Sequence, residues 1–212
     1  MTSHASPCVY IVDDDRKVLT ALSRLLTVTG YRVRAFESPR MFLAEHDPEI
    51  PGCALFDVGM AEVDGLALQD ILQRGGRSRP IIFITGHDDA KTSVRAMKAG
   101  AVDYLTKPVQ DTELLAAVQN AIDADLRARR DNAEVVELRR KLSLLTAREA
   151  EVMNQVVRGR LNKQIAFDLG IVEKTVKVHR ARVMAKMDVR SVAALVHVAE
   201  ALGMHAPGTP TN

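Results

Sequence analysis

The sequence predicts two folds in one chain: an α/β domain with a parallel sheet, followed by a smaller domain made of helices only. In residues 1–122, short apolar runs alternate with helical patterns, which is typical of a parallel sheet covered by helices on both faces. After them, helical patterns follow one another with no strand pattern between them. The chain has 212 residues, of which 47% are hydrophobic, so it is large enough for two modest cores.

Charge is distributed unevenly along the chain, although the net charge is only +2. Residues 1–122 carry 13 Lys and Arg against 16 Asp and Glu, whereas residues 146–212 carry 10 against 6. An acidic first part and a basic last part indicate a metal or phosphate site in one and a nucleic-acid contact in the other. The sequence shows no membrane-span or signal-peptide pattern, and Cys8 and Cys53 lack zinc or disulfide spacing. We therefore expect a cytoplasmic protein that does not bind a membrane.

The α/β domain begins with a strand at residues 9–12, where β-branched and aromatic side chains lead into three consecutive aspartates. A helical pattern follows at residues 18–26, and Gly30 suits the position just after a helix end. Residues 31–36 alternate as an outer strand does, and the next Ser-Pro pair opens a short helix. This order is the expected start of a parallel sheet.

Asp57 ends the strand around which we interpret this domain. Residues 53–57 are mostly apolar up to this carboxylate and lie between Gly52 and Gly59, as a buried strand of a covered sheet would. Ligands of open α/β sheets bind outside the carboxyl ends of the strands. We therefore expect Asp57 at the edge of the sheet where chemistry takes place.

The rest of the domain continues the alternation of helices and strands. Its strand at residues 80–85 is the most apolar run in the chain and is expected to be fully buried. Gly100 is placed to end the helix before the last strand. The predicted elements are a helix at residues 61–73, a strand at 80–85, a helix at 90–99 and a strand at 102–105.

Four strand ends bring polar side chains to one edge of the predicted sheet: Asp13 and Asp14, Asp57, Thr85 and Lys107. Carboxylates that lie close together repel one another, so they are stable mainly around a hard cation such as Mg²⁺ or Mn²⁺. An ammonium and a hydroxyl opposite them can hold phosphoryl oxygens, and a carboxylate can attack phosphorus to form an acyl phosphate. The set predicts phosphoryl transfer to an aspartate.

Each of these residues alone has a simpler explanation. An Asp after a strand often caps a helix, Thr85 can satisfy a turn, and Lys107 can be a solvated charge. Their joint occurrence at four strand ends favours the functional interpretation.

Five short motifs within residues 6–122 stand in an order and spacing that is specific to one family. They lie at residues 11–15, 55–60, 63–65, 84–87 and 103–108. By these motifs the segment resembles the receiver domain of two-component response regulators. The resemblance implies a flavodoxin-like, doubly wound sheet of five parallel strands in the order 2-1-3-4-5.

The resemblance also implies a role for each motif residue. Asp57 would accept phosphate from a sensor histidine kinase, and Tyr104 would be an aromatic switch. Ala61 departs from the family, which usually has proline there, so the loop beyond Asp57 lacks the residue that would pre-set its backbone, while the acceptor itself is unaffected. The dehalogenase-type phosphoaspartate family has a second Asp where this chain has Gly59. The implied Mg²⁺ ligands are Asp13, Asp14, Asp57 and the carbonyl of Gly59, and the implied phosphoryl-binding residues are Thr85 and Lys107.

Residues 123–144 are expected to form a helical linker, because helix-forming residues continue from Asp111 to Leu145 without Pro or Gly. Apolar residues recur at 3-4-3 spacing over barely two heptads, which leaves a short coiled coil as one alternative and favours a charged, semi-rigid helix as the other. The seam of the coiled coil would consist of Val135, Leu138, Leu142 and Leu145.

The basic end, residues 145–204, predicts four helices. Thr146 and Glu149 form a capping box at the first helix start, and Asn162 is placed to cap the second. A tight turn at Gly170 leads into a third, basic helix, which fits a helix-turn-helix that binds DNA. The helices are expected from 146 to 159, 162 to 169, 173 to 187 and 191 to 202, followed by a disordered tail at 205–212.

This end resembles the LuxR/FixJ-type DNA-binding domain through residues 145–149, 162–166, 169–170 and 174–180. Val172 departs from the Ser or Thr that is common before the third helix, so this helix lacks the usual side-chain cap. The resemblance implies that Lys177, Val178 and Ala181 face the major groove, while Lys174, Thr175, His179 and Arg182 contact phosphates or pack against the domain.

Together the resemblances predict a transcription factor that phosphorylation controls. Phosphorylation of Asp57 is expected to draw Thr85 and Lys107 inward, to let Tyr104 turn in, and to favour a homodimer. The dimer would bind an inverted-repeat operator in double-stranded DNA, with RNA polymerase as a further partner.

Two alternatives come from other functional classes. One is a regulator that binds DNA or a partner constitutively and uses the receiver only for assembly. The other is a phosphohydrolase, although no substrate pocket is indicated and the helix-turn-helix would be unexplained. We expect no enzyme activity beyond the protein's own phosphoryl transfer and dephosphorylation.

Overall fold

The computed structural model describes residues 6–60, 64–75, 79–86 and 90–204, and the chain divides into two compact units, Met1–Arg129 and Arg130–Asn212. The expectation for Ala61, parts of the motifs at 63–65 and 84–87, and the tail at 205–212 lie outside these described residues. Within the described part, no helix combines the length and the apolar character that a membrane crossing requires.

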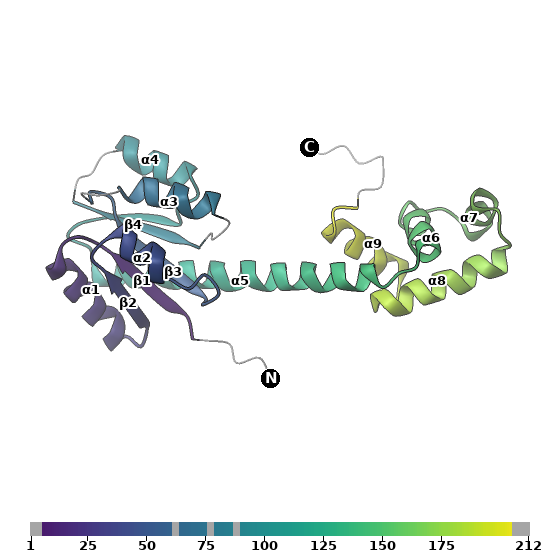
Figure 1. The fold of residues 1–212 in the computed structure, drawn as a ribbon, viewed down its shortest axis with the longest axis horizontal. Coiled ribbons are helices and arrows are strands. Elements are labelled where there is room, and N and C mark those ends of the chain that lie inside the picture. Colours follow the sequence, from purple (N-terminus) through teal and green to yellow (C-terminus); the bar gives the residue numbers. More distant parts are fainter. Residues whose placement is uncertain (1–5, 61–63, 76–78, 87–89, 205–212) are drawn as a thin grey trace. The chain divides into compact units, whose positions relative to one another are not determined.

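Unit 1 alternates strands and helices along the chain (Figure 1). Its strands are β1 (Cys8–Val12), β2 (Arg32–Phe36), β3 (Gly52–Asp57), β4 (Ile81–Thr85) and β5 (Asp103–Thr106). Its helices are α1 (Arg16–Val28), α2 (Pro39–Glu45), α3 (Gly65–Arg74), α4 (Ala90–Lys98) and the first part of α5 (Asp111–Ser143).

The five strands are parallel and lie in the order β2-β1-β3-β4-β5. This order confirms the predicted flavodoxin-like receiver fold. Asp57 pairs with Ile84, so the carboxyl ends of β3 and β4 lie at the same edge. The sheet therefore brings strand ends together that are distant in the sequence.

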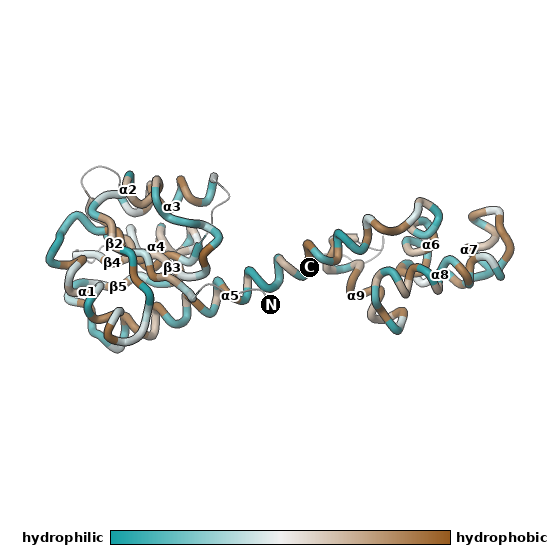
Figure 2. The backbone as a smooth tube through the Cα atoms, turned by 60° about the horizontal axis from the view of Figure 1, so that its bottom comes forward, coloured by the Kyte–Doolittle hydropathy of each residue, from teal (hydrophilic) through white to brown (hydrophobic). Residues whose placement is uncertain are grey.

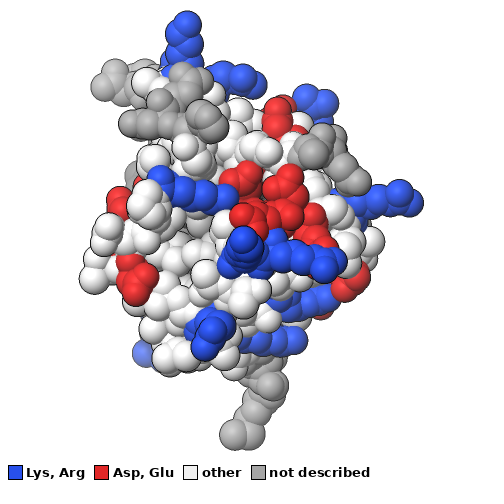
Figure 3. Space-filling model, turned by 90° about the vertical axis from the view of Figure 1, so that its left-hand side faces the viewer, with Lys and Arg blue, Asp and Glu red and all other residues white. Residues whose placement is uncertain are grey.

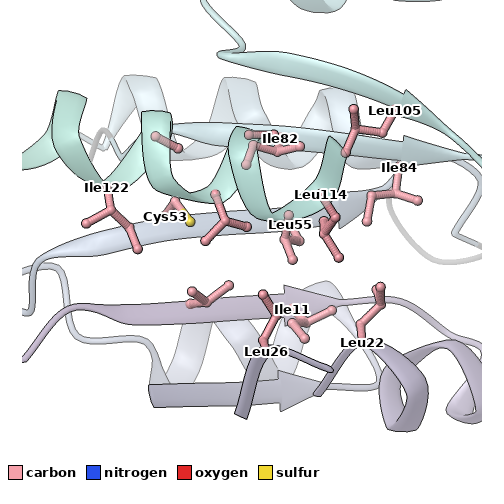
Figure 4. Packing of buried hydrophobic residues seen from close by; sticks show 14 of the residues in the cluster. Ile11, Leu22, Leu26, Cys53, Leu55, Ile82, Ile84, Leu105, Leu114 and Ile122 are labelled. Carbon is pink, nitrogen blue, oxygen red and sulfur yellow. The ribbon is translucent and has the colours of Figure 1, made fainter. Parts of the chain in front are cut away.

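Two apolar clusters cover the two faces of the sheet, because successive side chains of a strand point to opposite faces. On one face, Ile11, Leu55 and Ile82 pack against α1 and α5, as Figure 4 shows. On the other face, Tyr10 and Phe83 belong to a cluster with α2, α3 and α4. Both faces of the central strands are buried, as their continuous apolar runs predict.

The start of α3 differs from the prediction. The helix begins at Gly65 rather than at residue 61, and residues 61–63 are outside the described part. Asp64 is the N-cap, and its side chain accepts a hydrogen bond of 2.6 Å from the amide of Ala67. A side-chain oxygen that satisfies a free helix amide fixes the start of the helix here.

Helix α5 runs without a break across the division between the units, as predicted. Figure 2 shows the part of α5 around this division as mostly hydrophilic. Near its end, Leu142 and the following Leu145 pack on the core of unit 2. Two of the four side chains of the suggested coiled-coil seam are therefore used within unit 2.

Unit 2 consists of helices around one apolar core, in agreement with the predicted helix-turn-helix domain. The capping box of Thr146 and Glu149 is present, and Gly170 adopts the left-handed conformation, with φ 63°, between the second and third helices. After the end of α5, the described helices are α6 (Ala147–Val157), α7 (Asn162–Leu169), α8 (Glu173–Met187) and α9 (Val192–Ala201).

Two helix starts in unit 2 lack a side-chain cap. Leu161, not Asn162, is the N-cap of α7, and its amide donates a hydrogen bond of 2.9 Å to Gln164 Oε1. The prediction for Asn162 was wrong because its Oδ1 accepts a hydrogen bond from Arg180 instead. Val172 caps α8 without a side-chain hydrogen bond, as its apolar side chain predicts.

Candidate functional site

Asp57 and Asp13 are brought together at the carboxyl edge of the sheet. Asp57 ends β3 and Asp13 follows β1, and their exposed fractions are only 8% and 2%. Lys107, which follows β5, donates hydrogen bonds to both: Nζ lies 2.7 Å from Asp57 Oδ1 and 2.8 Å from Asp13 Oδ2. Three predicted residues from three strand ends therefore form one connected group.

Backbone amides hold the remaining carboxylate oxygens in place. The amide of Gly59 donates to Asp57 Oδ2 at 2.7 Å, and the amide of Asp15 donates to Asp13 Oδ1 at 2.8 Å. Each carboxylate is thus fixed by one amide and by the shared ammonium of Lys107. Such a fixed pair presents its oxygens in a defined direction.

Thr85 lies at the end of β4, beside the strand that carries Asp57. It is 5% exposed, and its carbonyl accepts a hydrogen bond of 2.7 Å from the amide of Lys107. The backbone therefore links the ends of β4 and β5 directly next to the Asp57 group.

Asp14 does not join Asp13 and Asp57 in one cluster. It is exposed, whereas the other two are buried. Among the described residues, no three His, Cys, Asp or Glu side chains are gathered closely enough to hold a metal ion. Figure 3 shows unit 1 from the left-hand side of Figure 1, with acidic side chains in one patch and basic side chains beside it. Two buried carboxylates, rather than three, form the centre of the site.

Burial and charge shift the pKa values of this group in opposite directions. Burial raises the pKa of the Asp13 carboxyl, although hydrogen bonds from Lys107 and from the Asp15 amide favour the ionised form. Burial alone would lower the pKa of Lys107, but its hydrogen bonds and charge interactions with Asp13 and Asp57 outweigh this effect and raise it. Lys107 therefore stays protonated and compensates part of the buried negative charge.

Tyr104 lies on β5 with its ring turned toward the core. The ring packs beside Phe83, with 6.4 Å between the ring centroids, and joins the apolar cluster of that face. Its hydroxyl is buried and has no hydrogen-bond partner among the described residues. The inward ring of Tyr104 is therefore part of the apolar packing on this face of the sheet.

An open pocket of about 340 Å³ lies beside Lys107, between α1 and the start of α5. Apolar side chains form most of its wall, among them Leu22, Leu25 and Leu114. The pocket thus offers an apolar surface next to the Asp57 group.

Helix α8 presents a basic face with apolar positions on it. Its buried side, Val176 and Val183, packs in the core of unit 2. Five of the seven predicted DNA-contacting residues are exposed, whereas Thr175 and His179 are partly buried and lie at packing positions. The exposed residues are Lys174, Lys177, Val178, Ala181 and Arg182.

Two contacts that the sequence did not predict hold α8 in place. Arg180 Nη1 donates to Asn162 Oδ1 at 2.9 Å, which joins α8 to the start of α7. Lys186 Nζ lies 2.6 Å from Glu149 Oε2 and 3.0 Å from the carbonyl of Leu144. The hydrogen bonds from Lys186 and from the Thr146 amide lower the pKa of Glu149 to about 2. These contacts fix the basic helix against α6 and α7.

A second set of polar residues in unit 1 was also missed. Arg79 and Asp125 are 4% exposed, and Asp125 pairs with Arg129 on α5. The available signal was weak: charged residues that are spaced four apart on a helix usually mark a solvated face. What sets these residues apart from a solvated face is their burial, and burial depends on the tertiary fold.

Comparison with known proteins finds the same two parts in the same order. Residues 9–119 match the family described as "Response regulator receiver domain", and residues 143–199 match "Bacterial regulatory proteins, luxR family". "Response regulator protein TodT" of Pseudomonas putida is 45% identical over 202 residues, which cover 95% of this chain and 88% of that protein.

Two further similarities also span most of the chain. "Transcriptional regulatory protein FixJ" of Rhizobium meliloti is 40% identical over 195 residues, which cover 92% of this chain and 96% of that protein. The solved structure of response regulator StyR superposes with a TM-score of 0.82 at 42% identity, covering 92% of this chain and 99% of that one. The similarity therefore extends over both units.

Proposed function

The chain belongs to the response regulators of two-component systems that join a receiver domain to a LuxR-family DNA-binding domain, and we propose that phosphorylation of Asp57 controls its binding to operator DNA. It is a transcription regulator and not an enzyme. A receiver domain implies a histidine kinase as partner, and the LuxR-family domain implies DNA as ligand. The observation that carries the proposal is the ammonium of Lys107 within hydrogen-bond distance of both Asp13 and Asp57.

Asp57 is the acceptor in this proposal, because it is the carboxylate at the end of the central strand β3. Lys107 Nζ, which lies 2.7 Å from Asp57 Oδ1, would exchange this contact for one with a phosphoryl oxygen. Thr85, at the end of the neighbouring strand, supplies a hydroxyl for a second phosphoryl oxygen. The kinase would dock over the apolar pocket beside Lys107, which lies next to the acceptor.

The donor set suits a divalent cation such as Mg²⁺ or Mn²⁺. Two carboxylates and one ammonium leave a net negative charge, and Mg²⁺ takes only one or two protein carboxylates together with waters and phosphate oxygens. Asp13, Asp57 and the carbonyl of Gly59 would hold the ion, and the exposed Asp14 would be the further carboxylate ligand beside them. A bound ion neutralises charge on the transferred phosphoryl group.

Phosphorylation adds negative charge and strong hydrogen-bond acceptors at Asp57, which attract Thr85 and Lys107. In our proposal, the inward ring of Tyr104 belongs to the phosphorylated state, and an outward ring belongs to the resting state. The change repacks the surface around β4 and β5 and favours a homodimer.

Dimerisation would raise DNA affinity because two tethered domains bind together, with a gain on the order of 10²–10⁴. A twofold dimer predicts an inverted-repeat operator whose half-sites lie about one helical turn apart. On α8, Lys177, Val178 and Ala181 would face the bases, while Lys174 and Arg182 would contact phosphates. Thr175 and His179 would support the helix by packing, and RNA polymerase would be the next partner on the DNA.

A constitutive DNA binder is the second candidate. It would not need Lys107 and Asp57 to be held together at the edge of the sheet, so the observed geometry favours the phosphorylation-controlled form.

The test is the intact mass of wild type and Asp57→Ala after incubation with Mg²⁺ and acetyl phosphate. We expect one phosphoryl adduct on wild type and none on the variant. Lack of an adduct on wild type, with kinase donors failing as well, would leave the constitutive binder as the better description.

A further inference from the structure

Asp125 and Arg129 join α5 to the end of the sheet where the parallel strands begin. The Asp57 group lies at the other end, where the strands finish. Asp125, which is 4% exposed, accepts a hydrogen bond of 2.8 Å from the amide of Gly52 at the start of β3. The same carboxylate oxygen lies 2.7 Å from Nε of Arg129, one turn further along α5. One buried carboxylate therefore connects a strand to the helix that leads out of unit 1.

Arg129 also binds the loop that precedes β3. Its guanidinium donates to the carbonyl of Pro48 at 2.6 Å and to that of Glu49 at 3.1 Å. Arg79, which is stacked on Tyr10, donates to the carbonyl of Asp47 at 2.9 Å in the same loop. Because two guanidinium groups hold consecutive carbonyls, this loop is fixed to α5 and to the sheet.

The strand that receives this contact is also the strand that carries the acceptor. β3 begins at Gly52 and ends at Asp57, and it is buried along its whole length. Gly52 cannot give way to a larger residue, because its φ is 142° and a Cβ would lie 1.9 Å from the carbonyl oxygen of Cys8. A close-packed strand transmits small displacements instead of absorbing them.

We propose that Asp125 and Arg129 form a latch that passes the phosphorylation state of Asp57 through β3 to α5, and thereby to DNA binding. The proposal rests on the proposed function of Asp57. The latch fixes where α5 leaves unit 1, and α5 continues into unit 2 without a break. Without the latch, Asp57 is still phosphorylated normally, but α5 no longer responds to the phosphorylation.

The experiment compares full-length wild type with Arg129→Ala, Asp125→Ala and the double variant. Arg127→Ala is the matched control, because Arg127 is an exposed arginine on the same helix. Each protein is incubated with Mg²⁺ and acetyl phosphate, and its phosphoryl adduct is measured by intact mass. Affinity is then measured with and without phosphorylation, on a duplex that wild type selects from a random-sequence pool.

We expect all proteins to take the adduct. Wild type and Arg127→Ala should gain at least ~10-fold in affinity on phosphorylation, and the latch variants less than ~3-fold. The double variant should lose no more than either single one, since both residues act as a unit. If Arg129→Ala does not fold, Arg129→Lys serves instead, because lysine keeps the charge but lacks the fork that reaches the loop.

A full affinity gain in the latch variants would overturn the latch. An adduct-free or unresponsive wild type would instead refute the proposed function, and the latch with it. The two failures are distinguished because the second is visible in wild type alone.

Discussion

The Asp57 group and the basic face of α8 are built in opposite ways. Lys107 is 94 positions from Asp13 and 50 from Asp57, so only the complete sheet brings them together. The predicted DNA-contacting residues all lie on one helix of 15 residues. Substitutions in the Asp57 group are therefore expected to have interdependent effects. Substitutions on the basic face of α8 are expected to have effects that nearly add.

The largest effect should come from removing the charge of Lys107. In Lys107→Met, two buried carboxylates lose their shared partner, and breaking such a pair destabilises unit 1 by about 3 kcal/mol. Asp13→Asn in the same chain should restore part of this loss, because it removes one of the two charges. Urea denaturation without added divalent cation measures all four members of the cycle. Additive effects would contradict the interdependence of this site.

On α8, two lysines should give separable effects on DNA binding. Lys177→Ala should relax base preference by about 1–3 kcal/mol, whereas Lys174→Ala should weaken binding to all sequences and lower the salt slope by about 1. Affinities for selected and random duplexes over a range of salt concentrations check both. Equal losses on both duplexes for both variants would refute the assigned roles.

Glu149 differs from the predicted DNA-contacting residues of α8, because it is held by a partner, Lys186, that is 37 positions away. Its pKa falls from the ordinary 4.5 to about 2 in the folded protein. The ionised form therefore stabilises unit 2 above about pH 4.5, and this contribution disappears as the pH falls toward about 2. Thermal unfolding of Glu149→Gln should show a weaker dependence on pH in this range than wild type. Parallel profiles would contradict the assignment.

The smallest effect concerns the start of α8. Val172→Ser supplies the missing N-cap and should stabilise unit 2 by up to about 1 kcal/mol. Thermal unfolding of unit 2 measures this, and Val172→Ala serves as the control that removes bulk without adding a cap. A cap that changes nothing would mean that packing alone fixes this helix start.

The sequence predicted well what depends on local pattern, and the family resemblance supplied the strand order. The alternation of apolar runs and helices gave the sheet, and the capping box at Thr146 gave the start of α6. The predicted start of α3 was wrong because Asp64, which lies inside the predicted helix, caps the helix with its side chain. This helix start follows from a local rule, the preference of Asp for the N-cap position.

Other features depend on contacts that no local pattern contains. Asn162 is a good cap by residue type, but Arg180, 18 positions away, binds its side chain. Asp125 lies 73 positions from Gly52, and its burial follows from how α5 packs on the sheet. The inward ring of Tyr104 likewise depends on its neighbours in the fold. These are tertiary effects, which outweigh residue preferences.

The most direct test of the account is DNA affinity as a function of the state of Asp57. Wild type and Asp57→Ala are compared on a selected inverted-repeat duplex, each with and without Mg²⁺ and acetyl phosphate. We predict that only wild type binds more tightly after treatment, by at least ~10-fold, and that the gain coincides with the phosphoryl adduct and with dimerisation. The same affinity for phosphorylated and untreated wild type would contradict the account.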